Sequence, residues 1–124
     1  MIERLIDSVI LIDHFNGIDK ATSFIHGLDP LKTAISVITR AEIFAGLEEE
    51  GQAMVTPLLD QYRLLIIDKP IADLTAQLRR KYGWKLPDAF QAALAHYHKT
   101  KLTTRNRKDF DPKTHSFVEV PYSL

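Results

Sequence analysis

Short apolar runs alternate along the whole chain with segments whose apolar residues recur at helical spacing. The apolar runs predict strands, and the segments between them predict helices. A helix in each connection makes consecutive strands run in the same direction, so the sheet should be mostly parallel. We therefore predict an α/β fold of three layers, in which a sheet of four to five strands lies between helices.

The boundaries of these elements follow from the same pattern. Strands are predicted over 2–6, 33–37, 64–67, 101–104 and 117–120, the last at an edge. Helices are predicted from residue 8, over 19–26, over 39–49, along the apolar stripe 54–62, over 70–82 and from residue 87. Gly51 should end the helix over 39–49, because glycine commonly follows a helix. Pro57 should kink the next helix or delay its start.

Composition sets limits on the function. The chain has 124 residues, 45% of them apolar, which predicts one domain over residues 1–124 with a substantial core. Sixteen Lys and Arg balance sixteen Asp and Glu, which argues against a binder held by bulk positive charge. The chain has no cysteine, which excludes disulfide scaffolds, thiolate zinc sites and cysteine nucleophiles.

Neither a leader nor a membrane segment is visible. Acidic residues interrupt the first residues of the chain, where a signal peptide needs an apolar core. No uncharged stretch approaches the ~18 apolar residues of a membrane span. We expect a cytoplasmic protein without a membrane partner.

Four acidic residues occupy unusual places. Asp7 and Asp109 follow predicted strands, and Glu42 lies in the first turns of a helix that follows another. Asp88 directly follows Pro87, which opens a helix. Because ligands of parallel sheets gather at the carboxyl ends of the strands, these four carboxylates should converge on one pocket. Clustered carboxylates repel one another unless a cation neutralises them, and oxygen ligands favour Mg²⁺ or Mn²⁺.

Each acidic residue also has a purely structural interpretation. Asp7 could cap a helix, and the Glu42 side chain could bend outward to water. Asp88 could complement a helix dipole. Asp109 and Asn106, three residues apart, could form a reciprocal pair like a capping box. These four roles need no shared location, whereas a metal site does.

Other residue patterns give weaker support for a catalytic or binding site. His96 and His98 are two residues apart and point to different sides of a helix, so they make a poor zinc site. The five glycines form neither a P-loop nor a dinucleotide fingerprint, and no Gly-x-Ser-x-Gly elbow occurs. Arg105, Arg107 and Lys108 flank Asp109 and could contact phosphates or be ordinary surface.

Four motifs in register resemble the PIN-domain family. Residues 6–12 (Ile-Asp-Ser-Val-Ile-Leu-Ile) resemble its opening signature, and residues 39–43 (Thr-Arg-Ala-Glu-Ile) its second acidic motif. Residues 86–89 (Leu-Pro-Asp-Ala) with Ala92 and Ala93 resemble the third, and residues 104–110 the fourth. The similarity spans the chain and is closest to the VapC toxins of toxin–antitoxin pairs. Val9 departs from the small polar residue that the family often has there, which puts a supporting contact in doubt and not the metal ligands.

The resemblance implies a Mg²⁺-dependent endoribonuclease, in which Mn²⁺ can substitute, that cuts tRNA or rRNA. Asp7 and Asp88 are implied as direct metal ligands, with Glu42 and Asp109 binding directly or through water. The supporting residues are implied to be Ser8 and Asn106, which would orient carboxylates or substrate, with Arg105 and Arg107 near the RNA.

The resemblance also implies a homodimer silenced by an antitoxin that lies in an apolar groove. Phe15, Phe44, Leu47 and the stripe 54–62 are candidate walls of that groove, although such residues more often form core. With the four acids neutralised by metal, the chain keeps an excess of four positive charges, the right sign for RNA.

Two other classes of function compete with a nuclease. A non-catalytic PIN-like module could bind RNA or protein, but such a module should have lost an acid, and none is missing. A phosphatase could use Asp7 as its nucleophile. That chemistry usually needs a second carboxylate two residues on, where this chain has Val9.

Overall fold

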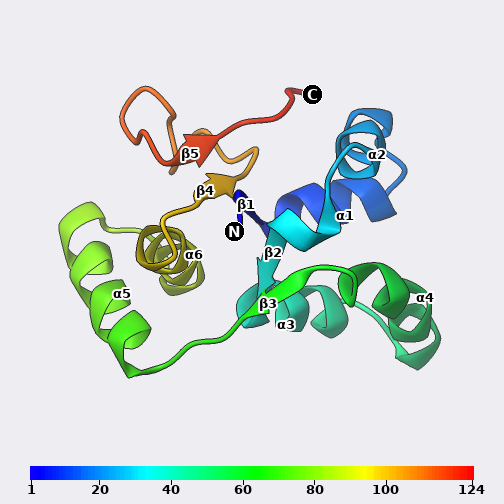
Figure 1. Cartoon of the computed structure of the whole chain (residues 1–124), viewed down its shortest axis with the longest axis horizontal. Coiled ribbons are helices and arrows are strands. Elements are labelled where there is room, and N and C mark those ends of the chain that lie inside the picture. The colour runs from blue at the N-terminus through cyan, green and yellow to red at the C-terminus, as the bar shows by residue number, and fades with distance from the viewer.

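Five parallel strands form one sheet in the order β3-β2-β1-β4-β5 (Figure 1). The computed structural model describes residues 1–124. The strands are β1 (Arg4–Ile6), β2 (Thr33–Ser36), β3 (Arg63–Leu65), β4 (Lys101–Thr103) and β5 (Val118–Glu119). The helices are α1 (Ser8–Phe15), α2 (Asp19–His26), α3 (Val37–Ala45), α4 (Glu49–Leu59), α5 (Lys69–Tyr82) and α6 (Leu86–Tyr97), and a 3₁₀ turn covers Pro30–Lys32. The predicted α/β fold with a parallel sheet is confirmed.

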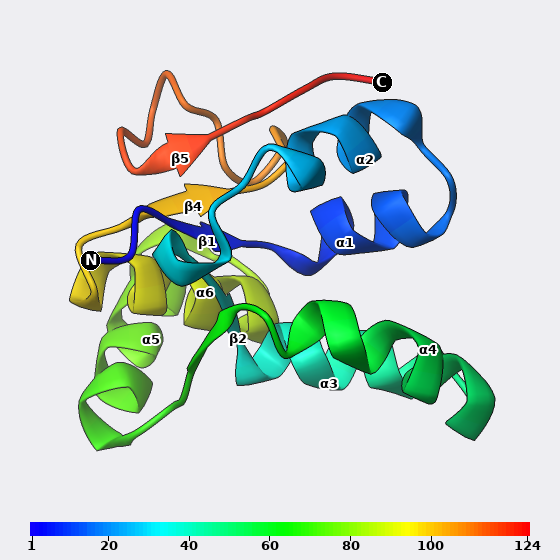
Figure 2. The same ribbon diagram turned by 45° about the vertical axis from the view of Figure 1, so that its right-hand side comes forward.

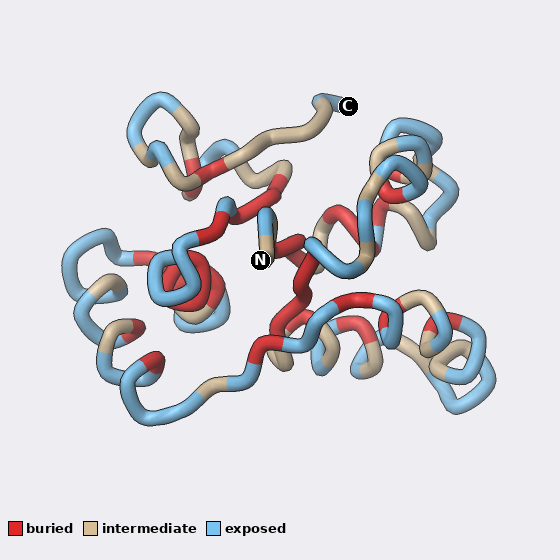
Figure 3. Tube along the Cα trace, in the orientation of Figure 1, coloured by how far each residue is buried: buried red, intermediate tan, exposed pale blue.

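The two faces of the sheet bury separate apolar clusters, because successive strand side chains point to opposite faces. Leu5, Ala34 and Leu102 pack with residues of α5 and α6 on one face. Ile6 and Ile35 pack with residues of α1, α2, α3 and α4 on the other. The structure therefore has the three layers that the sequence predicts, and Figure 3 shows the central strands as its most buried part.

Two expectations for the middle of the chain are wrong. The helix predicted over 39–49 ends at Ala45, because Gly46 takes the capping position. Gly51 instead lies inside α4, where a Cβ atom would come within 3.1 Å of the Leu47 side chain. Gly51 thus allows a close approach and does not end a helix. Pro57 does not delay α4 either, because it lies in the last turn of a helix that begins at Glu49.

The C-terminal segment runs beyond β5 to the side of the molecule that carries α1 and α2 (Figure 2). There the Tyr122 hydroxyl donates a hydrogen bond of 2.8 Å to Asp13 Oδ2. The Lys20 ammonium donates one of 2.6 Å to the Ser123 carbonyl. The C-terminal segment is therefore joined to α1 and α2 on one face of the sheet.

Leu102 provides a test of the central packing. It lies in β4 between β1 and β5 and is fully buried. Leu102→Ala should lower the free energy of unfolding by about 2 to 5 kcal/mol, because it removes buried apolar contacts and leaves a cavity. The measurement is urea unfolding followed by circular dichroism. Leu31→Ala is the matched control, since Leu31 is 71% exposed and its loss should change little. Equal effects of the two substitutions would contradict this packing.

Candidate active site

The Asp7 carboxylate is buried at the carboxyl end of the central strand. Asp7 Oδ1 accepts hydrogen bonds from the Ser8 backbone N–H (2.9 Å) and from Gln91 Nε2 (3.2 Å). Asp7 Oδ2 accepts one from the Thr104 hydroxyl at 2.8 Å. The expected capping role of Asp7 at α1 is thus confirmed. Because each carboxylate oxygen can accept about two hydrogen bonds, Oδ2 keeps one free lone pair.

The other three acids surround the same place. Glu42 lies in α3, Asp88 in the first turn of α6, and Asp109 in the turn after β4. Burial raises the pKa of Asp88 to about 6, and the negative charges of Asp7, Asp109 and Glu42 contribute to the rise. Charges act this way only over short distances. The structure therefore brings the four predicted acids together at the carboxyl edge of the sheet.

Glu42 has a more open position than Asp7. Burial of its carboxyl group raises its pKa, the nearby Ser8 hydroxyl partly offsets this, and the charge of Asp7 raises it further. Ser8 thus lies near both carboxylates, as a polar support should.

Asp109 is held by the reciprocal pair that its spacing predicts. Asn106 Nδ2 donates to Asp109 Oδ2 at 3.0 Å, and the Asp109 N–H donates to Asn106 Oδ1 at 3.3 Å. The Asn106 N–H donates to the Thr104 hydroxyl, which in turn donates to Asp7. Asp109 therefore has a structural role in its loop and also lies close to the other acids.

Arg105, which we expected near the substrate, is held by a different partner. Its Nε and Nη2 atoms donate to the two Asp13 carboxylate oxygens at 2.7 and 2.9 Å. This fork lowers the pKa of Asp13, although burial of that carboxyl group opposes the effect. Arg105 therefore ties the loop that carries Asp109 to α1. Arg107, by contrast, is exposed and makes no salt bridge.

Two polar residues that we did not predict for the site, Gln91 and Thr104, donate hydrogen bonds to Asp7, and Thr39 in turn binds Gln91. Gln91 is buried and donates both to Asp7 and to the Thr39 hydroxyl, the latter at 2.8 Å. Thr104 directly follows β4 and reaches Asp7. A signal was present for Gln91, which lies three residues after Asp88 on the same helix. Because such residues are neighbours on a helix surface, that spacing could have indicated it.

The donor set fits a hard divalent cation. The structure has no group of three or more His, Asp and Glu side chains arranged to hold one ion directly. Mg²⁺, however, usually binds one or two carboxylates and keeps several of its waters. Asp7 Oδ2 and the Asp88 carboxylate would supply oxygen ligands to such a cation, and the buried Gln91 Oε1 has no hydrogen-bond partner. A hydrated cation there would offset the burial and the neighbouring negative charges that raise the pKa of Asp88.

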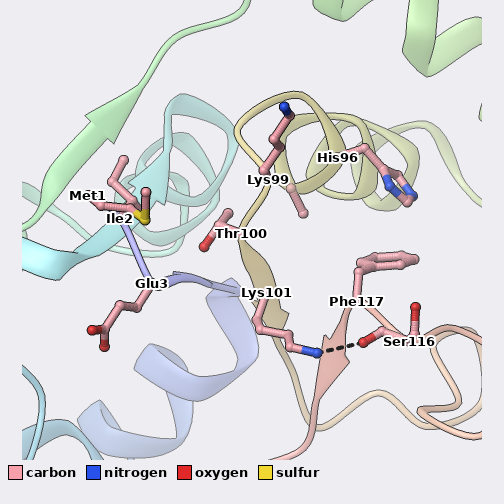
Figure 4. A pocket seen from close by; sticks show the side chains of 10 residues that line it. Met1, Ile2, Glu3, His96, Lys99, Thr100, Lys101, Ser116 and Phe117 are labelled. Atoms are coloured by element: carbon pink, nitrogen blue, oxygen red, sulfur yellow. Dashed lines mark hydrogen bonds between the residues drawn. The ribbon is translucent and has the colours of Figure 1, made fainter.

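The surface has three hollows, and the largest of them is not beside the four acidic residues of the site. The largest, about 540 Å³, lies at the opposite edge of the sheet, between Glu3, which precedes β1, and Lys101 at the start of β4 (Figure 4). A groove of about 210 Å³ lies between α1 and α3, with Phe15, Leu47 and Glu42 in its walls. Phe44 and the stripe 54–62 do not line it; Val55, Leu59 and Tyr62 of that stripe are buried in the core. A third hollow adjoins Asp109.

The fold and the acidic edge define a class of protein. The model of the PIN domain family matches residues 4–113. The chain belongs to the PIN-domain family, and within it the chain resembles the VapC-like toxins. PIN domains are generally nucleases that depend on divalent metals.

Solved structures agree with this family. The chain is 36% identical to a chain of a toxin–antitoxin complex from Klebsiella pneumoniae, with a TM-score of 0.88 over 98% of this chain and 100% of that one. FitAcB from Neisseria gonorrhoeae is 22% identical (TM-score 0.78, 98% and 99% covered), and DNA-bound VapBC from Salmonella typhimurium is 20% identical (TM-score 0.77, 90% and 92% covered). The last two show the fold alone. No curated protein matches the chain significantly. None of the helices is sufficiently long and apolar to span a membrane.

Asp88 allows the shared site to be tested without a substrate. In EDTA at pH 7, Asp88→Asn should stabilise the protein by about 1 kcal/mol after allowance for solvent screening, because it removes a charge that burial and three carboxylates disfavour. The melting temperature should rise by roughly 4 °C. The advantage should shrink as the pH falls below about 6, where the folded protein protonates Asp88, and vanish near the ordinary pKa of 3.8, where the unfolded chain protonates it too.

The same melts in Mg²⁺ complete this test. Mg²⁺ should raise the melting temperature of the wild type more than that of Asp88→Asn, because a ligand stabilises only through the site it binds. Asp73→Asn is the control, since Asp73 is exposed on α5 and forms no salt bridge. If Asp88 only complements the helix dipole, its replacement should instead lower the melting temperature and leave the Mg²⁺ response unchanged.

Proposed function

We propose that the protein is a Mg²⁺-dependent endoribonuclease, in which Mn²⁺ can replace Mg²⁺, and the toxin of a toxin–antitoxin pair. Its substrate would be tRNA or rRNA, so that cleavage inhibits translation in the cytoplasm. The observation that carries the proposal is the position of Asp88, whose pKa is raised to about 6 by burial and by the nearby charges of Asp7, Asp109 and Glu42. Four carboxylates that lie close together repel one another, and this repulsion costs free energy unless a cation neutralises it.

The residues around the site have separate tasks in this proposal. Asp7 and Asp88 bind the cation directly, and Glu42 and Asp109 bind it directly or through water. When bound, Mg²⁺ lowers the pKa of a water molecule and stabilises negative charge on the phosphate and on the leaving oxygen. Gln91 and Thr104 donate the hydrogen bonds that fix the Asp7 carboxylate, and Asp7 Oδ2 would hold the cation through its remaining lone pair.

Polar supports keep the remaining carboxylates in place. Ser8 lies between Asp7 and Glu42, and Asn106 holds Asp109 through a pair of hydrogen bonds. Arg105 acts by fixing the loop of Asp109 through Asp13. Arg107 remains free for the phosphates of the RNA. No side chain needs to attack the phosphorus, because a water molecule is the nucleophile.

A partner protein would regulate this site. The similar structures from Klebsiella pneumoniae and Salmonella typhimurium are a toxin–antitoxin complex and a DNA-bound VapBC. Here the groove between α1 and α3 is walled by Ile12, Phe15, Ile43 and Leu47, and Glu42 borders it. An apolar segment of an antitoxin that binds in this groove would therefore also cover Glu42. We further propose that the toxin is a homodimer.

Cleavage of RNA is the direct test. The purified protein should cut structured RNA in Mg²⁺ or Mn²⁺ and stop in EDTA. Asp7→Asn and Asp88→Asn should reduce cutting to the level seen in EDTA while the fold persists, because asparagine also caps helices and keeps the shape of the side chain. Asp73→Asn should cut like the wild type. Full activity in EDTA would rule out the metal mechanism, and RNA binding without cutting by the intact protein would favour the non-catalytic module.

Expression in bacterial cells tests the role as a toxin. Expression of the chain alone should arrest growth, and Asp88→Asn should abolish the arrest, because the damage depends on cutting. Co-expression of the antitoxin encoded beside this chain should restore growth. Growth curves and the level of soluble protein are the measurements. Normal growth with abundant soluble wild-type protein would count against the toxin role.

A further inference from the structure

A polar hollow adjoins Asp109 and shares no lining residue with the groove between α1 and α3. Its volume is about 380 Å³, within the range of about 300 to 1,000 Å³ that is common for small-molecule sites. Aromatic residues at the end of α5 and just beyond it line the hollow together with residues that follow β4, namely Tyr82, Trp84, Arg107, Lys108, Asp109 and His115. One side chain, Asp109, thus belongs both to this hollow and to the acidic cluster.

The end of α5 fixes the positions of the aromatic rings that form one wall of the hollow. Tyr82 and Trp84 stack with ring centroids 4.5 Å apart and an interplanar angle of 21°. They can do so because Gly83 between them has φ 72°, a left-handed conformation that glycine adopts without strain. His115 meets both rings edge-on, at 5.1 and 5.2 Å between centroids.

The rings of this wall differ in exposure, and Tyr82 is the most open of them, since His115 is half-buried. Trp84 is buried, whereas Tyr82 is 42% exposed. The Trp84 indole N–H donates to the Asp109 carbonyl at 3.0 Å, which fixes the wall relative to the acids. The Lys81 ammonium lies 5.1 Å from the centre of the Tyr82 ring. A flat aromatic ligand could displace this exposed lysine, whose charge would remain beside it.

Unpaired positive charge borders the same hollow. Arg107 and Lys108 are exposed, make no salt bridge and donate no side-chain hydrogen bond within the protein. Asp111, by contrast, is occupied, since its Oδ1 accepts from the Lys113 N–H at 2.9 Å. An open aromatic ring beside free cations is the combination that binds unpaired nucleotides, with the base on the ring and the phosphate on the cations.

We propose that this hollow is a subsite for one unpaired nucleotide of a single-stranded RNA, next to the phosphate that is cut. The base stacks on Tyr82, which Trp84 supports from behind, and Arg107 and Lys108 contact the flanking phosphates. The inference rests on the proposed ribonuclease function and adds that the RNA must be unpaired beside the cleavage site. Arg107 and Lys108 lie beside the aromatic rings and can bind phosphates. The hollow therefore favours a nucleic acid over a protein partner.

Binding of a labelled RNA tests the subsite separately from catalysis. The probe is a fluorescein-labelled single strand of twelve nucleotides, measured by fluorescence anisotropy in Ca²⁺, which we use in place of Mg²⁺ to slow cutting. Tyr82→Ala should weaken binding about tenfold, since stacking of one base on an aromatic ring contributes at least that order of affinity. Tyr82→Phe should keep the wild-type affinity, because the ring remains. Tyr97→Ala is the matched control: Tyr97 is also exposed but lies at the far end of α6.

Two further measurements separate stacking from a loss of fold. Trp84 is the only tryptophan, so its fluorescence should change when the RNA binds to wild type and to Tyr97→Ala. Arg107→Ala should reduce the dependence of the logarithm of affinity on the logarithm of salt concentration by about 0.7, the value for one phosphate contact of a single strand. Arg63→Ala, with the same loss of charge on the distant edge strand β3, should leave that slope unchanged.

The outcomes distinguish this inference from the proposed function. If the wild type cuts RNA and Tyr82→Ala, although folded, binds the probe as the wild type does, the subsite is wrong and the nuclease stands. If Tyr82→Ala does not fold, an unchanged salt slope for Arg107→Ala together with silent Trp84 fluorescence overturns the subsite. If the wild type neither binds nor cuts the RNA, both proposals are wrong.

Discussion

The parallel pairing of β1 with β2 on one side and β4 on the other determines where the chemistry of this protein can take place. The register pairs Leu5 with both Ala34 and Leu102, so the three strands end at one edge. Asp7 follows β1, the loop of Asp109 follows β4, and the helix that carries Glu42 follows β2. Helix α6 runs back toward the start of β4, which puts Asp88 at the same edge. Backbone pairing alone thus gathers four acids that are far apart in the sequence.

The four acids lie close enough to repel one another, and the surrounding residues stabilise some of them more than others. Asp7 receives hydrogen bonds from Ser8, Gln91 and Thr104, which stabilise its charge even though it is buried. Asp88 receives no such bonds, and its pKa rises to about 6. The site therefore combines one carboxylate that hydrogen bonds hold in place with one whose pKa burial and neighbouring charges raise. A cation would favour the charged form of Asp88.

The loop of Asp109 joins three parts of the molecule. Thr104 reaches Asp7, Arg105 forms a fork with Asp13 of α1, and Asn106 holds Asp109. Asp13 also accepts a hydrogen bond from Tyr122, so the C-terminal segment supports the same loop. A single stretch of chain thus connects the proposed metal site, the first helix and the C-terminus. Beyond Asn106, the exposed Arg107 and Lys108 turn toward the aromatic wall of the proposed nucleotide subsite.

The sequence by itself determined the order of the elements and the candidate acids, because these depend on local patterns. Apolar residues at a period of two or 3.6 predicted the strands and helices, including the helix over 19–26 with the bounds that the structure has. The positions of Asp7 and Asp109 after strands, and of Asp88 after Pro87, predicted their common edge. The spacing of Asn106 and Asp109 predicted their hydrogen-bonded pair.

Only the tertiary structure decided which side chains partner one another across the chain. Arg105 binds Asp13, 92 residues away in the sequence, and no local pattern marks that pair. Gly46 ends α3, whereas Gly51 lies inside α4 close to the Leu47 side chain. The pKa of Asp88 depends on charges that β1, α3 and the loop after β4 bring to it. Periodicity acts over a few residues, whereas charge, burial and hydrogen bonding depend on distances in space that exist only once the sheet has formed.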